Sequence, residues 1–385
     1  MHELSTILQR WREAGRDGVL ATVVHVRGSA YRRPGARMLI LEDGSRVGTI
    51  SGGCLETDVV RKAWWWTDHG ATIRTFDNTR EDAARDFGLG CNGVITVLLE
   101  RVETAGVGRL LEFLEVRQRR REAVVVATVI RAADAGELAV GDRVLCDAGG
   151  IVEGADLPIA GLLTAAVRAT FAERRSRLVH LSDAEVFVEW VGPPQRLFVF
   201  GGGHDVVPLA ALARMMGWSL TIADSRLSRV EPGRFPDAEK IFTVPSSGDI
   251  SDLDIGHDDA VVVMTHNYPQ DVALMPHILA ANPRYLGLLG PRVRTEKMFA
   301  EIGADPLADN VHAPVGLDIG GDHPEGIALS IVAEIQSVLS GQPGGRLRRR
   351  KGAIHAPALE LGVEAPAPTW NPDHSIQPTC AVWYA

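Results

Sequence analysis

Residues 196–217, RLFVFGGGHDVVPLAALARMMG, limit the possible folds of this chain more than any other stretch. A continuous apolar segment runs directly into three glycines, and a helical pattern follows. Glycines suit such a turn because a Cβ would block both the tight reversal and the approach of a phosphate to the backbone amides. The stretch therefore predicts a strand, a glycine turn and a helix, the order found in dinucleotide-binding α/β domains.

Further apolar segments over residues 218–226, 260–267 and 285–292 predict three more strands, and residues 324–340 predict a closing helix. Strands that are apolar throughout and alternate with helices are typical of a parallel sheet covered on both faces. We therefore expect a Rossmann-like domain over residues 196–342. Gly201 and Gly203 give the pattern G-x-G, with Val206 at the third fingerprint position. Asp224 ends the second strand, where an acid accepts hydrogen bonds from a ribose.

Three further polar residues are expected at the carboxyl ends of these strands, the edge where open α/β sheets bind ligands. His204 follows the glycine turn, and His266 follows the apolar run AVVVMT. His266 suits a general base, although a histidine that only packs within its loop fits the sequence equally well. Arg292 is either a phosphate clamp or a surface arginine at a helix end.

The first half of the chain has a different sequence pattern, which predicts short strands, tight turns and several helices. Residues 1–191 predict a mostly antiparallel α+β domain, so the fold class is α/β with a Rossmann-like domain in second place. GPPQ, residues 192–195, is the expected linker between them, because Gly-Pro-Pro ends any strand or helix. Residues 343–385 are rich in alanine and proline and predict an extended C-terminal tail. Its aromatic residues need burial, so we expect a homodimer.

Charge and hydropathy narrow the class of protein. The formal net charge of −9 argues against general nucleic-acid binding. No apolar run reaches the roughly 18 residues that a membrane span needs. The N-terminus has no secretory pattern, so a cytoplasmic protein is expected. The sequence shows no Walker lysine, HExxH pair or nucleophile-elbow serine, so ATP hydrolysis, zinc proteolysis and α/β-hydrolase chemistry are not indicated.

Three glycine-rich loops in the first half carry arginine or cysteine. Residues 28–36, GSAYRRPGA, include Arg33 and can form an anion-binding nest of backbone amides. Gly52, Gly53 and Cys54 stand between a strand and a helix, where a helix dipole favours a thiolate. Cys91 lies in GLGCNG, residues 88–93. A thiolate suits a soft or sulfur-coordinated metal. A buried small apolar side chain is the alternative for either cysteine.

Several long motifs in the same order resemble the XdhC/CoxI family of accessory factors for molybdenum hydroxylases. They are GSAYRRPGARM, GTISGGCLE and GLGCNG in the first half. In the second half they are FVFGGGHD, ADSR, MTHNYPQD, YLGLLGPRVR and PVGLDIGGDHPEGIALSIVAEI. Gly326 and Asn92 depart from the usual family residues. The chain lacks the cysteine pattern of two iron–sulfur clusters and is too short for the molybdenum subunit itself.

The resemblance implies a chaperone that binds the molybdenum cofactor (molybdopterin), assists its sulfuration and inserts it into an apo-hydroxylase of the xanthine dehydrogenase type. A cysteine desulfurase is a further implied partner. Cys54 is then the first choice for contact with the metal, and Cys91 the second. The alternative function is an NAD(P)-dependent oxidoreductase, with His266 as acid/base and Cys54 as nucleophile. A third is a regulatory module that binds a nucleotide at Gly201–Gly203 without chemistry.

Overall fold

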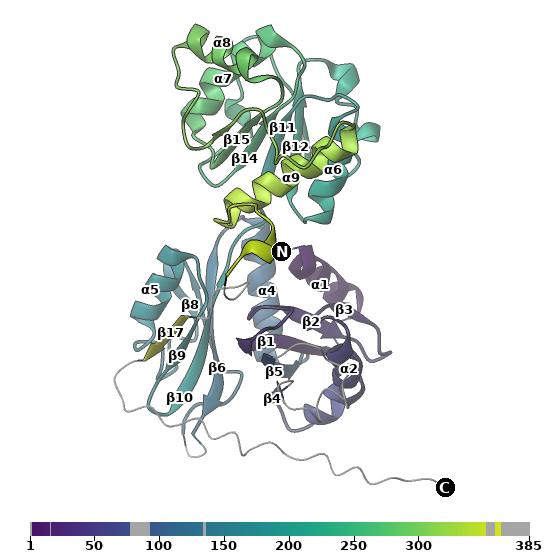
Figure 1. Ribbon diagram of the computed structural model, residues 1–385. Coiled ribbons are helices and arrows are strands. Elements are labelled where there is room, and N and C mark those ends of the chain that lie inside the picture. Colours follow the sequence, from purple (N-terminus) through teal and green to yellow (C-terminus); the bar gives the residue numbers. More distant parts are fainter. Residues whose placement is uncertain (1, 16, 78–92, 134–135, 352–358, 363–385) are drawn as a thin grey trace. The chain divides into compact units, whose positions relative to one another are not determined.

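The computed structural model describes residues 2–15, 17–77, 93–133, 136–351 and 359–362, and these form two compact units. One unit comprises Glu3–Pro193 together with the short strand β17 (Leu359–Gly362), and the other comprises Pro194–Gly352. The predicted fold class is confirmed, since an α+β unit precedes a Rossmann-like unit with a parallel sheet (Figure 1).

The N-terminal unit is built from two sheets, and two helices contribute to the core between them (Figure 1). The first sheet has the order β3-β2-β1-β5-β4, and the second β17-β9-β10-β6-β7-β8. Every pairing is antiparallel except that of β17 with β9. The first sheet contains β1 (Val19–Gly28), β2 (Arg37–Ile40), β3 (Arg46–Gly48), β4 (Thr72–Asp77) and β5 (Gly93–Arg101). The second adds β6 (Val124–Ala132), β7 (Arg143–Asp147), β8 (Gly150–Glu153), β9 (Arg177–His180) and β10 (Ala184–Val191).

Helices cover these sheets because each presents one apolar face. α1 (His2–Glu13) and α4 (Ala105–Arg119) pack in the core between the two sheets. α2 (Cys54–Trp66) covers the outer face of the first sheet, and α5 (Thr164–Glu173) that of the second. The apolar residues Ile7, Leu8 and Trp11 recur at helical spacing in the sequence, and all three are buried on one face of α1.

Two buried ion pairs connect the sheets. Arg37 of β2 donates to both carboxylate oxygens of Glu189 of β10, at 2.9 and 2.5 Å. Arg143 of β7 also pairs with a carboxylate of the other sheet, that of Glu100 of β5. All four side chains are buried, so their charges depend on each other for the hydrogen bonds that water would otherwise supply.

The C-terminal unit has one parallel sheet of order β13-β12-β11-β14-β15-β16. Alternate residues of each central strand face opposite sides, which explains why the strands are apolar throughout. α6 and α9 cover one face, and α7 and α8 the other (Figure 1). The strands are β11 (Arg196–Phe200), β12 (Ser219–Asp224), β13 (Lys240–Thr243), β14 (Ala260–Val263), β15 (Tyr285–Leu288) and β16 (Val311–His312). The helices are α6 (Val206–Met215), α7 (Tyr268–Ala281), α8 (Arg292–Ile302) and α9 (Pro324–Leu339).

This strand order reverses direction between β11 and β14, which places a topological switch point at their carboxyl ends. The loops after these two strands carry the predicted residues Gly201, Gly203, His204 and His266. β13 and β16 were not predicted from the sequence because both are short and only partly buried. β17 lies within the segment predicted as an extended tail.

Candidate functional site

The glycine pair before α2 is shaped by a buried glutamate. Gly53 is the N-cap residue, with φ at +120°, a conformation that favours glycine. Glu56, three residues further on, accepts hydrogen bonds from the Gly53 amide at 2.9 Å and the Ser51 amide at 2.7 Å. It also accepts from the Ser51 hydroxyl at 2.5 Å and the Ile50 amide at 3.3 Å. This is half of a capping box, because Gly53 has no side chain to return the bond.

Glu56 is 1% exposed, and its carboxylate is the negatively charged group of this turn. Burial raises its pKa, but the hydrogen bonds from Ser51 and the backbone outweigh that effect, and the pKa lies below its usual range. The Ile50, Ser51 and Gly53 amides are therefore bound to an internal carboxylate. An external anion at this turn has to use other groups.

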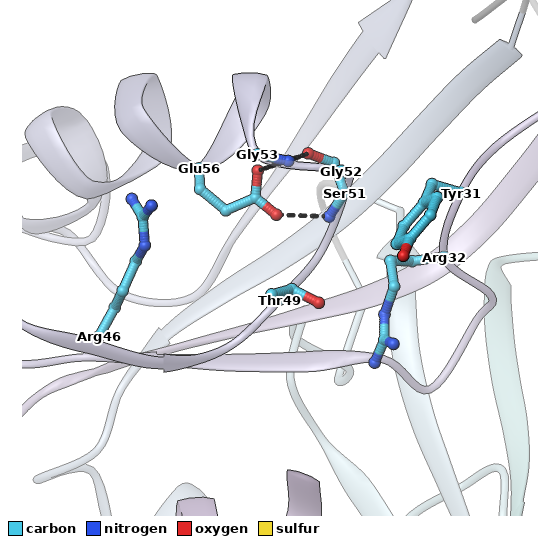
Figure 2. Close-up of a pocket in the computed structure, with 8 residues that line it drawn as sticks. All are labelled: Tyr31, Arg32, Arg46, Thr49, Ser51, Gly52, Gly53 and Glu56. Carbon is cyan, nitrogen blue, oxygen red and sulfur yellow. Dashed lines mark hydrogen bonds between the residues drawn. The ribbon is translucent and has the colours of Figure 1, made fainter.

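Such groups lie around a shallow cavity of about 270 Å³ in front of the turn (Figure 2). Figure 2 shows Arg46 on one side of Thr49, with Tyr31 and Arg32 on the other. Tyr31 is 71% exposed, and its ring lies beside Gly52: a Cβ there would be 3.8 Å from Cγ of the ring, an ordinary van der Waals distance. The lining residues are Tyr31, Arg32, Arg46, Thr49, Ser51, Gly52, Gly53 and Glu56.

The two arginines of the cavity differ in whether they pair with a carboxylate. Arg32 pairs with Glu3 of α1, whose other oxygen accepts from the Thr49 amide at 2.6 Å. Glu3 thereby joins the loop before β2 to the end of β3. Arg46 is exposed and has no hydrogen-bond or ion-pair partner within the described part of the chain. Arg46 is therefore the cation that the cavity presents to a ligand.

Of the site residues predicted in this half, some line the cavity and others do not. Gly52 and Gly53 line it, and Cys54 follows as the first residue of α2. Arg33 is half-buried and is not a lining residue, and burial lowers the pKa of its guanidinium. Cys91 lies outside the described residues. The roles predicted for these residues stay predictions.

The glycine turn of the second unit follows β11 as expected. Gly201 has φ at +134° and is buried, and Gly203 leads into α6. Asp224, at the end of β12, is fully buried and accepts the Gly202 amide at 2.9 Å. Burial raises the pKa of Asp224, but hydrogen bonds from Arg226 and Gly202 more than offset this and leave the pKa lowered.

A histidine–aspartate pair spans the switch point of the sheet. Nε2 of His266 lies 2.7 Å from Oδ2 of Asp205, which follows the glycine turn. The His266 side chain is 55% exposed, and its backbone is left-handed with φ at +54°. Asp205 is the N-cap residue of α6 but makes no capping hydrogen bond with its side chain. His204 and Arg292 are exposed at the same carboxyl-terminal edge.

The sequence interpretation gave no role to Tyr31, Arg46, Glu3 or Glu56. A signal existed for Glu56, since an acid three residues after an N-cap glycine is the spacing of a capping box. No local signal exists for Glu3, which reaches the loop from a helix far away in the sequence. Within the described residues, no cluster of three or more histidine, cysteine, aspartate or glutamate side chains is arranged to hold a metal. In the same part of the chain, no helix combines the length and apolarity of a membrane span.

Comparisons with known proteins agree with the motifs. The family description "XdhC and CoxI family" matches residues 11–77, and "XdhC Rossmann domain" matches residues 197–335. A Bacillus subtilis protein, named as a probable subunit of xanthine dehydrogenase, is 33% identical over 87% of this chain and 97% of its own length. The Escherichia coli molybdenum cofactor insertion chaperone PaoD is 25% identical over 84% of each chain.

A solved structure shares the fold of both units. The crystal structure described as a xanthine dehydrogenase from Bacillus halodurans superimposes with a TM-score of 0.73 at 30% identity. The likeness covers 89% of this chain and 96% of the other. Full-length likeness of this kind, together with the two family matches, shows that the chain belongs to the XdhC and CoxI family.

Proposed function

We propose that this chain is an accessory protein of a molybdenum enzyme, which binds the molybdenum cofactor as cargo and delivers it to the apo-hydroxylase. The name of the Escherichia coli relative, a molybdenum cofactor insertion chaperone, supports this function. So does the name of the Bacillus subtilis relative, which refers to xanthine dehydrogenase.

The observation that carries the proposal is the composition of the cavity before α2. It combines the cation of Arg46, unpaired among the described residues, with the exposed ring of Tyr31 and the bare backbone of Gly52. Molybdopterin has a phosphate, a flat pterin and a dithiolene that holds the metal. Arg46 fits the phosphate through charge-assisted hydrogen bonds, and Tyr31 fits the face of the pterin. The residues present therefore fit the cargo.

The cavity also has the form expected of a carrier. At about 270 Å³ it is smaller than the sites that enclose a cofactor permanently. A shallow site holds one face of its cargo and leaves the other accessible to the receiving enzyme. Glu56 is a positioning residue here, because its hydrogen bonds fix the turn on which Gly52, Gly53 and Cys54 stand.

Cys54 supplies the sulfur chemistry in this proposal. It follows the cavity-lining Gly53 and is the first residue of α2, a position for which the sequence predicts a thiolate. When bound, the cofactor supplies the molybdenum centre, and Cys54 is proposed to contact that centre or its terminal sulfur. Assistance in sulfuration, a cysteine desulfurase partner, a xanthine dehydrogenase target and homodimerisation extend the same proposal.

The His266–Asp205 pair favours one second candidate, an NAD(P)-dependent oxidoreductase with His266 as acid/base. Hydride transfer between NAD(P)H and a small carbonyl or purine substrate distinguishes it from a carrier. A carrier shows no turnover of this kind.

Pterin retention tests the carrier function. Four proteins are purified anaerobically from a molybdenum-replete host: the wild type, Arg46→Ala, Cys54→Ala and Arg61→Ala. The pterin that each releases is measured by fluorescence. Arg61 is the matched control, an exposed arginine of α2 that does not line the cavity. We expect pterin in the wild type and Arg61→Ala, and a loss in the other two. Absence of pterin from all four, in cells where a known molybdoenzyme is filled, overturns the proposal.

A further inference from the structure

The three glycines of the Rossmann-like turn are each pressed against the chain itself. A Cβ on Gly201 would overlap the carbonyl oxygen of Met264, and one on Gly202 would overlap that of Arg229. A Cβ on Gly203 would overlap the carboxylate of Asp205. Backbone contacts that involve no phosphate thus account for Gly201 and Gly202, and Gly203 lies against the side chain of Asp205.

Two arginines hold residues 226–234 on this turn. Arg226 donates from Nε and Nη2 to the two carboxylate oxygens of Asp224, at 2.9 and 3.0 Å, and from Nη2 to the Thr265 carbonyl at 3.0 Å. Arg234 donates from Nη1 to the carbonyl oxygens of Gly202 at 2.8 Å and Arg229 at 3.0 Å. The segment is therefore fixed at both ends, and the backbone of Arg229 lies against Gly202.

The acid that a dinucleotide would need is fully engaged by these contacts. Oδ1 of Asp224 accepts from the backbone amide and Nε of Arg226, both at 2.9 Å. Oδ2 accepts from the Gly202 amide and Nη2 of Arg226. The side chain is 0% exposed. A ribose hydroxyl would have to displace the bidentate guanidinium, a costly exchange in a buried site.

We infer that residues 226–234 fill the space at the glycine turn where a dinucleotide would bind. The Rossmann-like unit therefore binds no NAD(P) there, and Asp224 holds the chain's own arginine instead of a ribose. The turn then has a structural role, because its contacts hold together the ends of β11, β12 and β14. The same sheet edge leaves the His266–Asp205 pair accessible, together with the exposed His204 and Arg292. The inference concerns this unit alone. It does not depend on cofactor delivery, and it argues against the NAD(P)-dependent alternative.

The test combines binding with stability in the full chain. Equilibrium dialysis with NADH and with NADPH at millimolar concentration measures occupancy of the wild type. Thermal unfolding of Asp224→Asn is compared with that of Asp237→Asn, a control that weakens the exposed Arg214–Asp237 pair of the same unit. We expect no saturable binding of either dinucleotide, and a lower unfolding midpoint for Asp224→Asn than for Asp237→Asn.

Two results overturn the inference. One is saturable binding of NADH or NADPH that Asp224→Asn removes, because Asp224 would then bind ribose. The other is an Asp224→Asn variant as stable as Asp237→Asn, because Asp224 would then anchor nothing. If Asp224→Asn fails to fold, hydrogen exchange of the Gly202 amide in the wild type decides. Strong protection that NADH does not change supports the inference, and rapid exchange that NADH slows contradicts it.

Discussion

Replacing Glu56 with glutamine tests how much the turn before α2 depends on one buried charge. Glutamine keeps the shape of the side chain but removes the negative charge and places an amide NH2 where an acceptor is needed. Three short contacts, from the Ser51 amide, the Ser51 hydroxyl and the Gly53 amide, lose their ionic acceptor in whole or in part.

The magnitude follows from these contacts. A hydrogen bond to a charged group contributes about 1.5–3 kcal/mol, so three contacts set an upper bound of about 4.5–9 kcal/mol. Gly52 and Gly53 are exposed, so water replaces part of the loss. We expect a decrease of about 3–5 kcal/mol in the free energy of unfolding, in the range for breaking a buried ionic network. In a unit of this size that is about 6–20 °C in the midpoint.

Thermal unfolding followed by tryptophan fluorescence measures this change. The described N-terminal unit contains Trp11, Trp64, Trp65, Trp66 and Trp190, whereas the described C-terminal unit contains Trp218. Glu42→Gln is the control, because Glu42 is exposed, lies in the same unit and has no partner within the described residues. If Glu56→Gln and Glu42→Gln unfold at the same midpoint, the reasoning about the turn is wrong.

The pH dependence has a definite sign. The folded-state pKa of Glu56 is lowered, so its contribution is complete above the unfolded-state pKa of about 4.5 and decreases as pH falls through the folded-state value. The stability difference between the wild type and Glu56→Gln should therefore shrink below pH of about 4.5. A difference that grows on acidification would contradict this assignment.

Three further predictions concern buried groups. Glu189→Gln should lower the free energy of unfolding, measured in urea, by about 3–5 kcal/mol, because it leaves Arg37 buried without its anion. Glu153→Gln, at an exposed ion pair, should lower the free energy of unfolding by at most about 1 kcal/mol. Equal urea midpoints would show that the Arg37–Glu189 pair contributes no more to stability than the exposed pair. Burial and the Glu334 carboxylate raise the pKa of Tyr285 far above its usual range. Alkaline difference spectra of the wild type and Tyr285→Phe should therefore coincide until the protein unfolds, and an extra phenolate in the folded wild type would refute this. Burial, with a smaller effect from Asp147, raises the pKa of Cys146 to about 11, so Cys146→Ser should leave the count of rapidly reacting thiols unchanged. A loss of one rapidly reacting thiol would disprove it.

Features set by neighbouring residues were predictable from the sequence. The strand and glycine turn at 196–203 follow from an apolar run and steric limits, and the N-terminal helix follows from its periodicity. The start of α2 after Gly53 follows from a glycine next to a helical pattern. In each case the signal lies within about one or two helical turns of chain.

Features set by distant residues were not predictable in this way. Glu189 reaches Arg37 across 152 positions, and neither side chain has a neighbour in the sequence that reveals its partner. The Arg229 backbone covers Gly202 only because a loop folds back onto an earlier strand. Arg46 matters in the cavity because it has no partner among the described residues, a property that only the folded structure displays.

β17 has a practical consequence for dissecting this protein. Its residues Leu359–Gly362 form the outermost strand of the second sheet, beside β9. A truncation after Pro193 would thus remove the Rossmann-like half and also strip a strand from the half that remains. The backbone N–H and C=O groups of β9 would become an open template for pairing with other chains. An N-terminal half produced on its own should retain residues 359–362 through a grafted connection, or it will be prone to aggregate.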